Sequence, residues 1–84
     1  MNKEKLFEIV SNVFDIPKTE INFESSPQTI EKWDSFNGYI LLDEIENNFN
    51  VKFSLDEVLE IKNLEDFKKL LEKQGIQFDN EEKA

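Results

Sequence analysis

The sequence contains no cysteine and no histidine among its 84 residues. It therefore lacks the commonest nucleophile–base pairs and the commonest metal ligands of proteins, and no disulfide can stabilise it. Glycine occurs only twice, and no glycine-rich phosphate-binding loop is present. We therefore expect a protein that has no metal site and no catalytic activity of its own.

Long hydrophobic segments are also missing. The longest uninterrupted apolar run extends from Tyr39 to Leu42, whereas a membrane-spanning helix needs about 20 apolar residues. The N-terminal stretch is charged and amphipathic and does not have the pattern of a signal peptide. Because a chain without cysteine is compatible with a reducing compartment, we expect a cytoplasmic protein.

Acidic residues dominate the charge of the chain. The formal net charge is -9, and the stretch from Glu31 to Asp66 contains ten acidic residues and only three lysines. A field of this sign repels nucleic-acid phosphates and anionic lipids, and it attracts basic patches on protein partners. We therefore expect neither nucleic-acid binding nor membrane insertion, although an acidic composition also serves solubility alone.

The apolar pattern predicts an all-α fold. Apolar residues recur at helical spacing in several segments, and no alternation typical of strands occurs. The expected architecture is a small four-helix bundle, with three longer helices, one short third helix and a long loop between helices one and two. We expect a monomer with a single domain over residues 1–78 and a disordered tail over residues 79–84. The predicted helices span residues 3–14, 35–48, 55–61 and 64–73, and the packed loop spans residues 15–33.

The predicted second helix carries the most informative residues. It begins at Ser35, with Asp34 as the N-cap. On a helical wheel Phe36 and Ile40 lie away from the core, whereas Gly38 lies on the buried side, where a missing side chain indicates close packing. The residues expected to face the core are Leu42, Ile45 and Phe49.

The short third helix is predicted to start with a capping box. Ser54 bonds forward to the helix, and Glu57 reaches back to the backbone of the capping residue. We expect the apolar side chains of this helix, Leu55, Val58 and Leu59, to face the core.

Ser35 differs from the other serines of the chain, which occupy a polar helix face, a turn or the capping box. It is expected in the first turn of a helix, where unpaired N–H groups and the helix dipole favour an anion. A phosphodiester formed on its hydroxyl would be stabilised there. Taken alone, however, an Asp-Ser pair before an apolar helix also fits a simple helix start, so both interpretations stay open at this point.

The order of motifs from Ile30 to Leu71 resembles the acyl carrier protein family, whose members are phosphopantetheine-attachment domains. The family's Asp-Ser-Leu at the start of the second helix reads Asp34-Ser35-Phe36 here. The apolar pair that follows, and the motif apolar-Glu-x-x-Phe-x-apolar, correspond to Leu41-Leu42 and to the stretch from Ile45 to Val51. The third and fourth helices follow the family order, and helix one and the long loop fit it more loosely.

The resemblance implies that Ser35 receives a 4′-phosphopantetheine arm from coenzyme A, beside the helix cap Asp34. A separate phosphopantetheinyl transferase would attach the arm. Its thiol would carry acyl or aminoacyl groups as thioesters, which would supply a cysteine-free chain with a thiol. The further partners implied are acyl- or aminoacyl-activating ligases and acyl-transferring enzymes, whose basic patches would dock against the acidic second helix.

The docking surface implied by the resemblance departs from the family pattern. Phe36 replaces the usual leucine, and Asn37 and Ile40 stand where fatty-acid carriers are often acidic. Trp33 before the Asp-Ser pair is similar to stand-alone carriers found beside sugar-modification or secondary-metabolite genes. Together with these departures, it implies a specialised carrier and not the main fatty-acid carrier. The expected docking residues are Phe36, Asn37, Ile40, Asp43, Glu44 and Glu46.

Two alternatives stay open. The same bundle would serve as an interaction module without a prosthetic group if Phe36 and Ile40 formed an exposed apolar docking pair. An aminoacyl or D-alanyl carrier would keep the arm and change only the cargo. The sequence leaves both the cargo and the pathway undecided.

Overall fold

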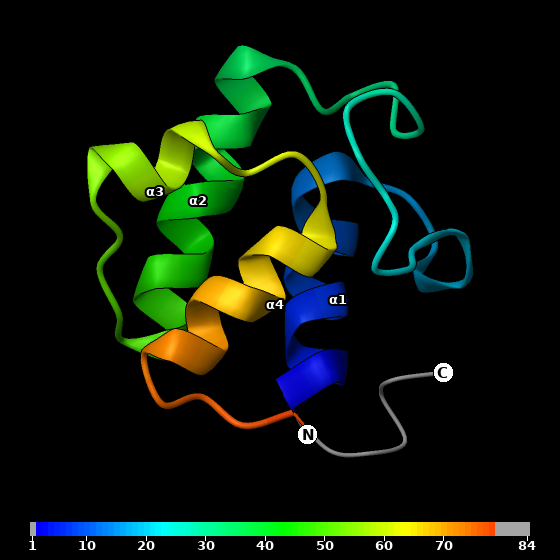
Figure 1. The fold of residues 1–84 in the computed structure, drawn as a ribbon. Helices are drawn as coiled ribbons and strands as arrows, with labels where there is room; N and C mark the ends of the chain where they lie inside the picture. The colour runs from blue at the N-terminus through cyan, green and yellow to red at the C-terminus, as the bar shows by residue number, and fades with distance from the viewer. Residues whose placement is uncertain (1, 79–84) are drawn as a thin grey trace.

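The computed structural model describes residues 2–78, which form an all-helical fold without strands (Figure 1). Its helices are α1 (Asn2–Phe14), the short 3-10 helix η1 (Lys18–Glu20), α2 (Ser35–Phe49), α3 (Leu55–Leu59) and α4 (Leu64–Lys73). The predicted small helical bundle with a short third helix and a long first loop is confirmed. The tail expected over residues 79–84 lies outside the described residues and stays a prediction. Within residues 2–78, no helix has both the length and the apolar character needed to cross a bilayer.

Local capping signals determine where the helices begin and end. The side chains of Asp34, Ser54 and Asn63 each accept a hydrogen bond from a backbone N–H of the helix that follows, which satisfies a donor that would otherwise have no partner. α2 ends where Asn50 adopts a left-handed backbone with a φ of 57°, and Gly75 after α4 has a φ of 96°. The caps predicted at Asp34 and Ser54 are confirmed.

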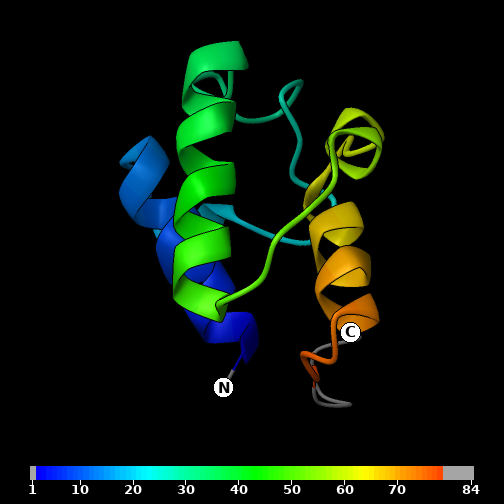
Figure 2. The same ribbon diagram turned by 90° about the vertical axis from the view of Figure 1, so that its left-hand side faces the viewer.

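The core lies between α1, α2 and α4. α1 and α2 pack side by side and run in opposite directions (Figures 1 and 2). Aromatic rings fill the centre, where the Trp33 ring stacks 5.6 Å from Phe14 and 6.4 Å from Phe67, measured between ring centroids. The buried apolar residues are Leu6, Phe7, Ile9, Val10, Phe14, Ile21, Ile30, Trp33, Leu41, Ile45, Phe49, Leu64, Phe67 and Leu71.

The loop over residues 15–33 is part of the packed structure. It buries apolar side chains in the core, and its backbone binds the start of α4. The N–H of Leu64 donates to the carbonyl of Ser25 at 3.0 Å, and the N–H of Glu65 donates to the carbonyl of Phe23 at 2.8 Å. The prediction of a packed loop is therefore confirmed, while η1 within the loop was not predicted.

The orientation predicted for the third helix is wrong in part. Leu55 and Leu59 are 68% and 72% exposed, and only Val58 is partly covered. α3 contains five residues, so it has too few turns for its apolar spacing to define a buried face. Its capping box is present as predicted, and Lys73 Nζ lies 3.4 Å from Glu57 Oε2. These contacts hold α3 from its polar side and leave its leucines in solvent.

Candidate functional site

Ser35 is the first residue of α2, and its side chain is exposed. The helix begins there because Asp34 has an extended backbone and its Oδ1 accepts the N–H of Asn37 at 2.8 Å. Asn37 Nδ2 in turn donates to the carbonyl of Lys32 at 2.8 Å. These two bonds fix the first turn of α2 to the end of the long loop, so the hydroxyl of Ser35 projects from a rigid position.

The N-terminus of α2 keeps free hydrogen-bond donors. At the start of α4 the first amides are used by the long loop and by Asn63. Within residues 2–78, by contrast, no acceptor binds the N–H of Ser35 or Phe36, and the Ser35 hydroxyl makes no hydrogen bond. The free amides carry the partial positive charge of the helix dipole. The hydroxyl is accessible to solvent. Because the chain has no histidine, it lacks the commonest activating base.

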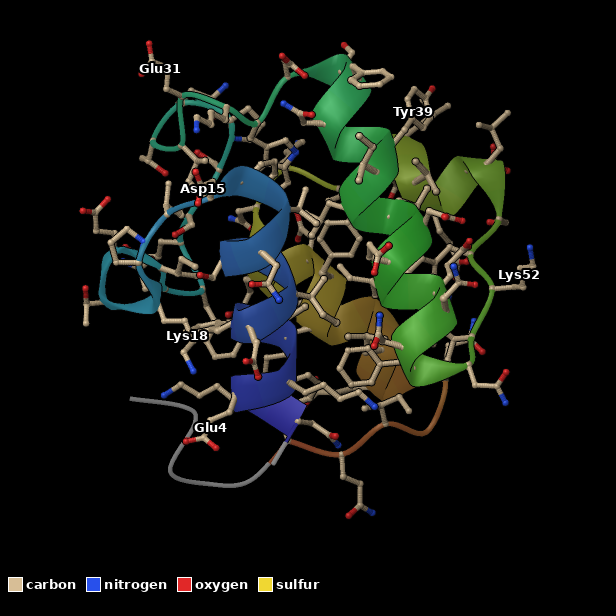
Figure 3. All side chains as sticks on the ribbon, turned by 180° about the vertical axis from the view of Figure 1, so that it is seen from behind. Glu4, Asp15, Lys18, Glu31, Tyr39 and Lys52 are labelled. Atoms are coloured by element: carbon tan, nitrogen blue, oxygen red, sulfur yellow. The ribbon has the colours of Figure 1, made fainter. Side chains whose placement is uncertain are left out.

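A pocket of about 280 Å³ opens directly beside Ser35, between the N-terminal part of α2 and the C-terminal end of α3. Asp34 and Ser35 belong to its lining. Its other lining residues are Trp33, Gly38, Tyr39, Leu42, Val58, Leu59, Ile61 and Phe67. Figure 3 shows Tyr39 on the flank of α2 that faces away from α1. This pocket was not predicted from the sequence; its signals there are Trp33 before the Asp-Ser pair and Gly38, which was expected in a close contact.

A second, wider groove of about 600 Å³ runs between α1 and α2. Ile40 and Glu44 form its α2 border, and Lys5 and Glu8 lie on its α1 border. Two of the predicted docking residues therefore face α1 and not the pocket beside Ser35.

The other predicted docking residues separate into two groups. Phe36 and Asp43 are exposed and, at helical spacing, lie on the outer face of α2. Asn37 and Glu46 bind the backbone instead: Glu46 Oε2 accepts the N–H of Phe53 at 2.9 Å and thereby anchors the connection between α2 and α3. The structure thus distributes the predicted docking residues over three sides of α2.

One titratable group in this region is perturbed. The pKa of Glu57 lies below its ordinary value, because the carboxylate accepts the backbone N–H of Ser54 and because Lys73 lies beside it. This carboxylate stabilises the start of α3 and stands outside the pocket that Ser35 lines. Among residues 2–78, no three acidic side chains converge closely enough to hold a metal ion.

The arrangement combines an accessible hydroxyl, a positively polarised helix end and an adjacent apolar pocket. A group bonded to this hydroxyl would lie beside the pocket. No model of a known protein family matches the chain, and no curated protein matches its sequence.

Proposed function

We propose that this chain is an acyl carrier protein that holds acyl or aminoacyl groups as thioesters on a 4′-phosphopantetheine arm attached to Ser35. The observation that carries the proposal is the Ser35 hydroxyl, which is exposed and without a hydrogen bond to residues 2–78. It stands at a helix N-terminus whose first amides are also free. The resemblance of the surrounding motifs to acyl carrier proteins gives this hydroxyl its proposed role.

The residues around Ser35 fit a phosphodiester. The free N–H groups of Ser35 and Phe36 favour an anion at this helix end, whereas the carboxylate of Asp34 repels one. Because this attraction and this repulsion oppose each other, we expect the phosphate to be bound weakly, so that the arm would remain free to move. The arm would supply the thiol that the chain does not encode.

Attachment of the arm requires a second protein. The Ser35 oxygen would form a bond to the phosphorus of coenzyme A that carries pantetheine, and the bond to the departing adenosine 3′,5′-bisphosphate would break. The hydroxyl proton must go to a base of the phosphopantetheinyl transferase, because this chain has no histidine to accept it. Ser35 itself would perform no catalysis.

The charge of α2 favours partners with basic surfaces. The segment from Trp33 to Val51 contains no lysine, and Asp43 and Glu44 are exposed on it. Electrostatic attraction of this kind speeds encounter and orients the partner. The proposed partners are the transferase, a ligase that activates acyl or aminoacyl groups and the enzymes that receive them.

A second candidate function is an interaction module that carries no arm. The observation in its favour is that Phe36 and Tyr39 are exposed in neighbouring turns of α2. Large apolar side chains surrounded by acids are common at protein-binding sites. The two candidates differ in whether Ser35 is needed.

Intact mass spectrometry distinguishes these candidates. The protein is incubated with coenzyme A and a phosphopantetheinyl transferase of broad specificity, and its mass should rise by one arm. Ser35→Ala should abolish the gain, whereas Ser26→Ala, which changes a partly exposed serine of the long loop, should retain it. A wild-type protein that gains no mass, or a gain that survives Ser35→Ala, would refute the carrier proposal.

A further inference from the structure

Trp33 presents a polar edge to the pocket beside Ser35. The side chain is only 8% exposed, and its ring faces are covered by Phe14 and Phe67 at centroid distances of 5.6 and 6.4 Å. The stacking fixes the plane of the indole. Its N–H therefore points in a constant direction.

The indole N–H is left uncovered by Gly38. A Cβ atom at position 38 would lie 3.3 Å from Trp33 Nε1 and 3.6 Å from Trp33 Cδ1, so the missing side chain is what keeps this edge open. Within residues 2–78, no group accepts a hydrogen bond from Nε1. Within residues 2–78, every fully buried side-chain nitrogen or oxygen has a hydrogen-bond partner. Since Nε1 has none, it is not fully buried. Nε1 must therefore be reached from outside, and both Trp33 and Gly38 line the pocket.

The N–H of a largely buried tryptophan usually binds an acceptor, and here such an acceptor can reach it only through the pocket. Trp33 Nε1 thus supplies the pocket with a donor held in place by ring stacking, among apolar side chains such as Leu42, Ile61 and Phe67. A site of this kind discriminates strongly between a ligand that supplies the matching acceptor and one that lacks it.

The size and charge of the pocket restrict the ligand further. Its volume of about 280 Å³ lies below the roughly 300–1,000 Å³ of pockets for drug-sized ligands, so it suits a short group. Asp34 lines it, and none of the lining residues within 2–78 carries a positive charge. An anionic cargo would be repelled, and the acceptor must belong to a neutral group such as a ketone, amide or hydroxyl.

We propose that this pocket selects the cargo of the carrier: a short acyl group that carries no negative charge and has a hydrogen-bond acceptor, which Trp33 Nε1 binds. The inference rests on the proposed function, because it requires an arm on Ser35 to deliver the group. It goes further by naming a cargo class and the two residues that determine it. Trp33 donates, and Gly38 keeps the donor accessible.

The test compares two cargos of equal chain length. The transferase charges the protein with butyryl- or 3-oxobutyryl-phosphopantetheine from the corresponding coenzyme A thioesters, or with the bare arm, and intact mass verifies each product. Since the chain has a single tryptophan, a ¹⁵N-labelled sample gives one indole N–H signal in an NMR spectrum. We expect its proton to shift downfield with 3-oxobutyryl, and to remain near the position of the bare-arm protein with butyryl.

Gly38→Ala provides the matched variant. The added methyl group should cover Nε1 and abolish the 3-oxobutyryl-dependent shift, while arm attachment at Ser35 continues. Asn47→Ala, on the exposed side of the same helix, should retain the shift.

Each failure has a separate meaning. A protein that accepts no arm at all refutes the carrier function itself. A protein that is charged correctly overturns only the cargo inference if both thioesters shift the indole equally, if the bare arm already produces the full shift, or if Gly38→Ala leaves the shift intact.

Discussion

Phe36 and Phe49 form a matched pair for testing which face of α2 is buried. They lie on the same helix, yet Phe36 is 73% exposed and Phe49 is 7% exposed. Replacement by alanine removes the same ring from each position. Truncation of a buried phenylalanine costs about 3–5 kcal/mol. Phe36 has about a quarter of its surface covered, and full burial of such a side chain contributes about 1.5–3 kcal/mol to the free energy of unfolding. Replacement of Phe36 by alanine should therefore lower the free energy of unfolding by about 0.4–0.8 kcal/mol.

Urea unfolding measures the difference directly. With an m-value of about 1 kcal/mol/M for a domain of this size, Phe49→Ala should lower the midpoint by about 3 M or more, and Phe36→Ala by less than about 1 M. A small domain has about 5–10 kcal/mol of stability in total, so Phe49→Ala can leave too little folded protein to measure. Phe49→Leu removes fewer atoms and keeps the comparison possible.

Equal losses at the two positions would refute the assignment of the buried face. They would also remove the reason for expecting Phe36 at a partner interface. If the assignment is correct, Phe36→Ala should weaken binding to a transferase or ligase while the unfolding midpoint changes little. Phe49→Leu should lower the unfolding midpoint while the folded protein binds these partners with little change in affinity.

Three further predictions concern other parts of the fold. The pKa of Glu57 in the folded protein lies below the ordinary value of 4.5. The ionised carboxylate therefore stabilises the start of α3 above the unfolded pKa, and this stabilisation is lost as the pH falls through the folded pKa. Amide exchange in α3, corrected for intrinsic rates, should therefore accelerate over that range in the wild type and depend much less on pH in Glu57→Gln. Asn50→Val should lower stability by about 1–2 kcal/mol in thermal melts, because a β-branched residue disfavours the left-handed φ of 57°; Asn50→Gly should not. Affinity for a basic partner should fall as salt rises from 0.15 to about 1 M and the screening length shortens from about 8 to 3 Å, and an Asp43→Asn, Glu44→Gln double variant should show a smaller decrease.

The sequence predicted those features that depend on neighbours along the chain. Asp34 and Ser54 cap helices because each carries an acceptor that reaches an amide three residues on, and this geometry is local. Gly38 was expected in a close contact, and the structure identifies the contact as the Trp33 indole. Local chemistry was therefore sufficient for the starts of α2, α3 and α4 and for the position of Ser35, whereas α3 ends two residues before its predicted end.

Features that depend on distant contacts could not be predicted in this way. Leu55 and Leu59 have the apolar character of core residues, but both are exposed, and α3 contacts α4 through the ion pair of Glu57 with Lys73 on its polar side. Glu46 has the character of a surface acid, but the chain after α2 turns back so that Phe53 donates to it. The pocket likewise arises from the approach of α3 to α2, which no spacing within either helix encodes.

The bond between Asn2 and Gln77 has a practical consequence for how this protein can be handled. Asn2 Nδ2 donates to the carbonyl of Gln77 at 2.6 Å, so α1 starts beside the segment that follows α4, at the pole of the bundle opposite the start of α2 (Figures 1 and 2). A purification tag, a fusion partner or a tether to a sensor surface joined on either side of residues 2–78 would therefore leave from the same pole. The protein would be attached at that one pole, and the end of the bundle that carries Ser35 would remain accessible to partners in solution.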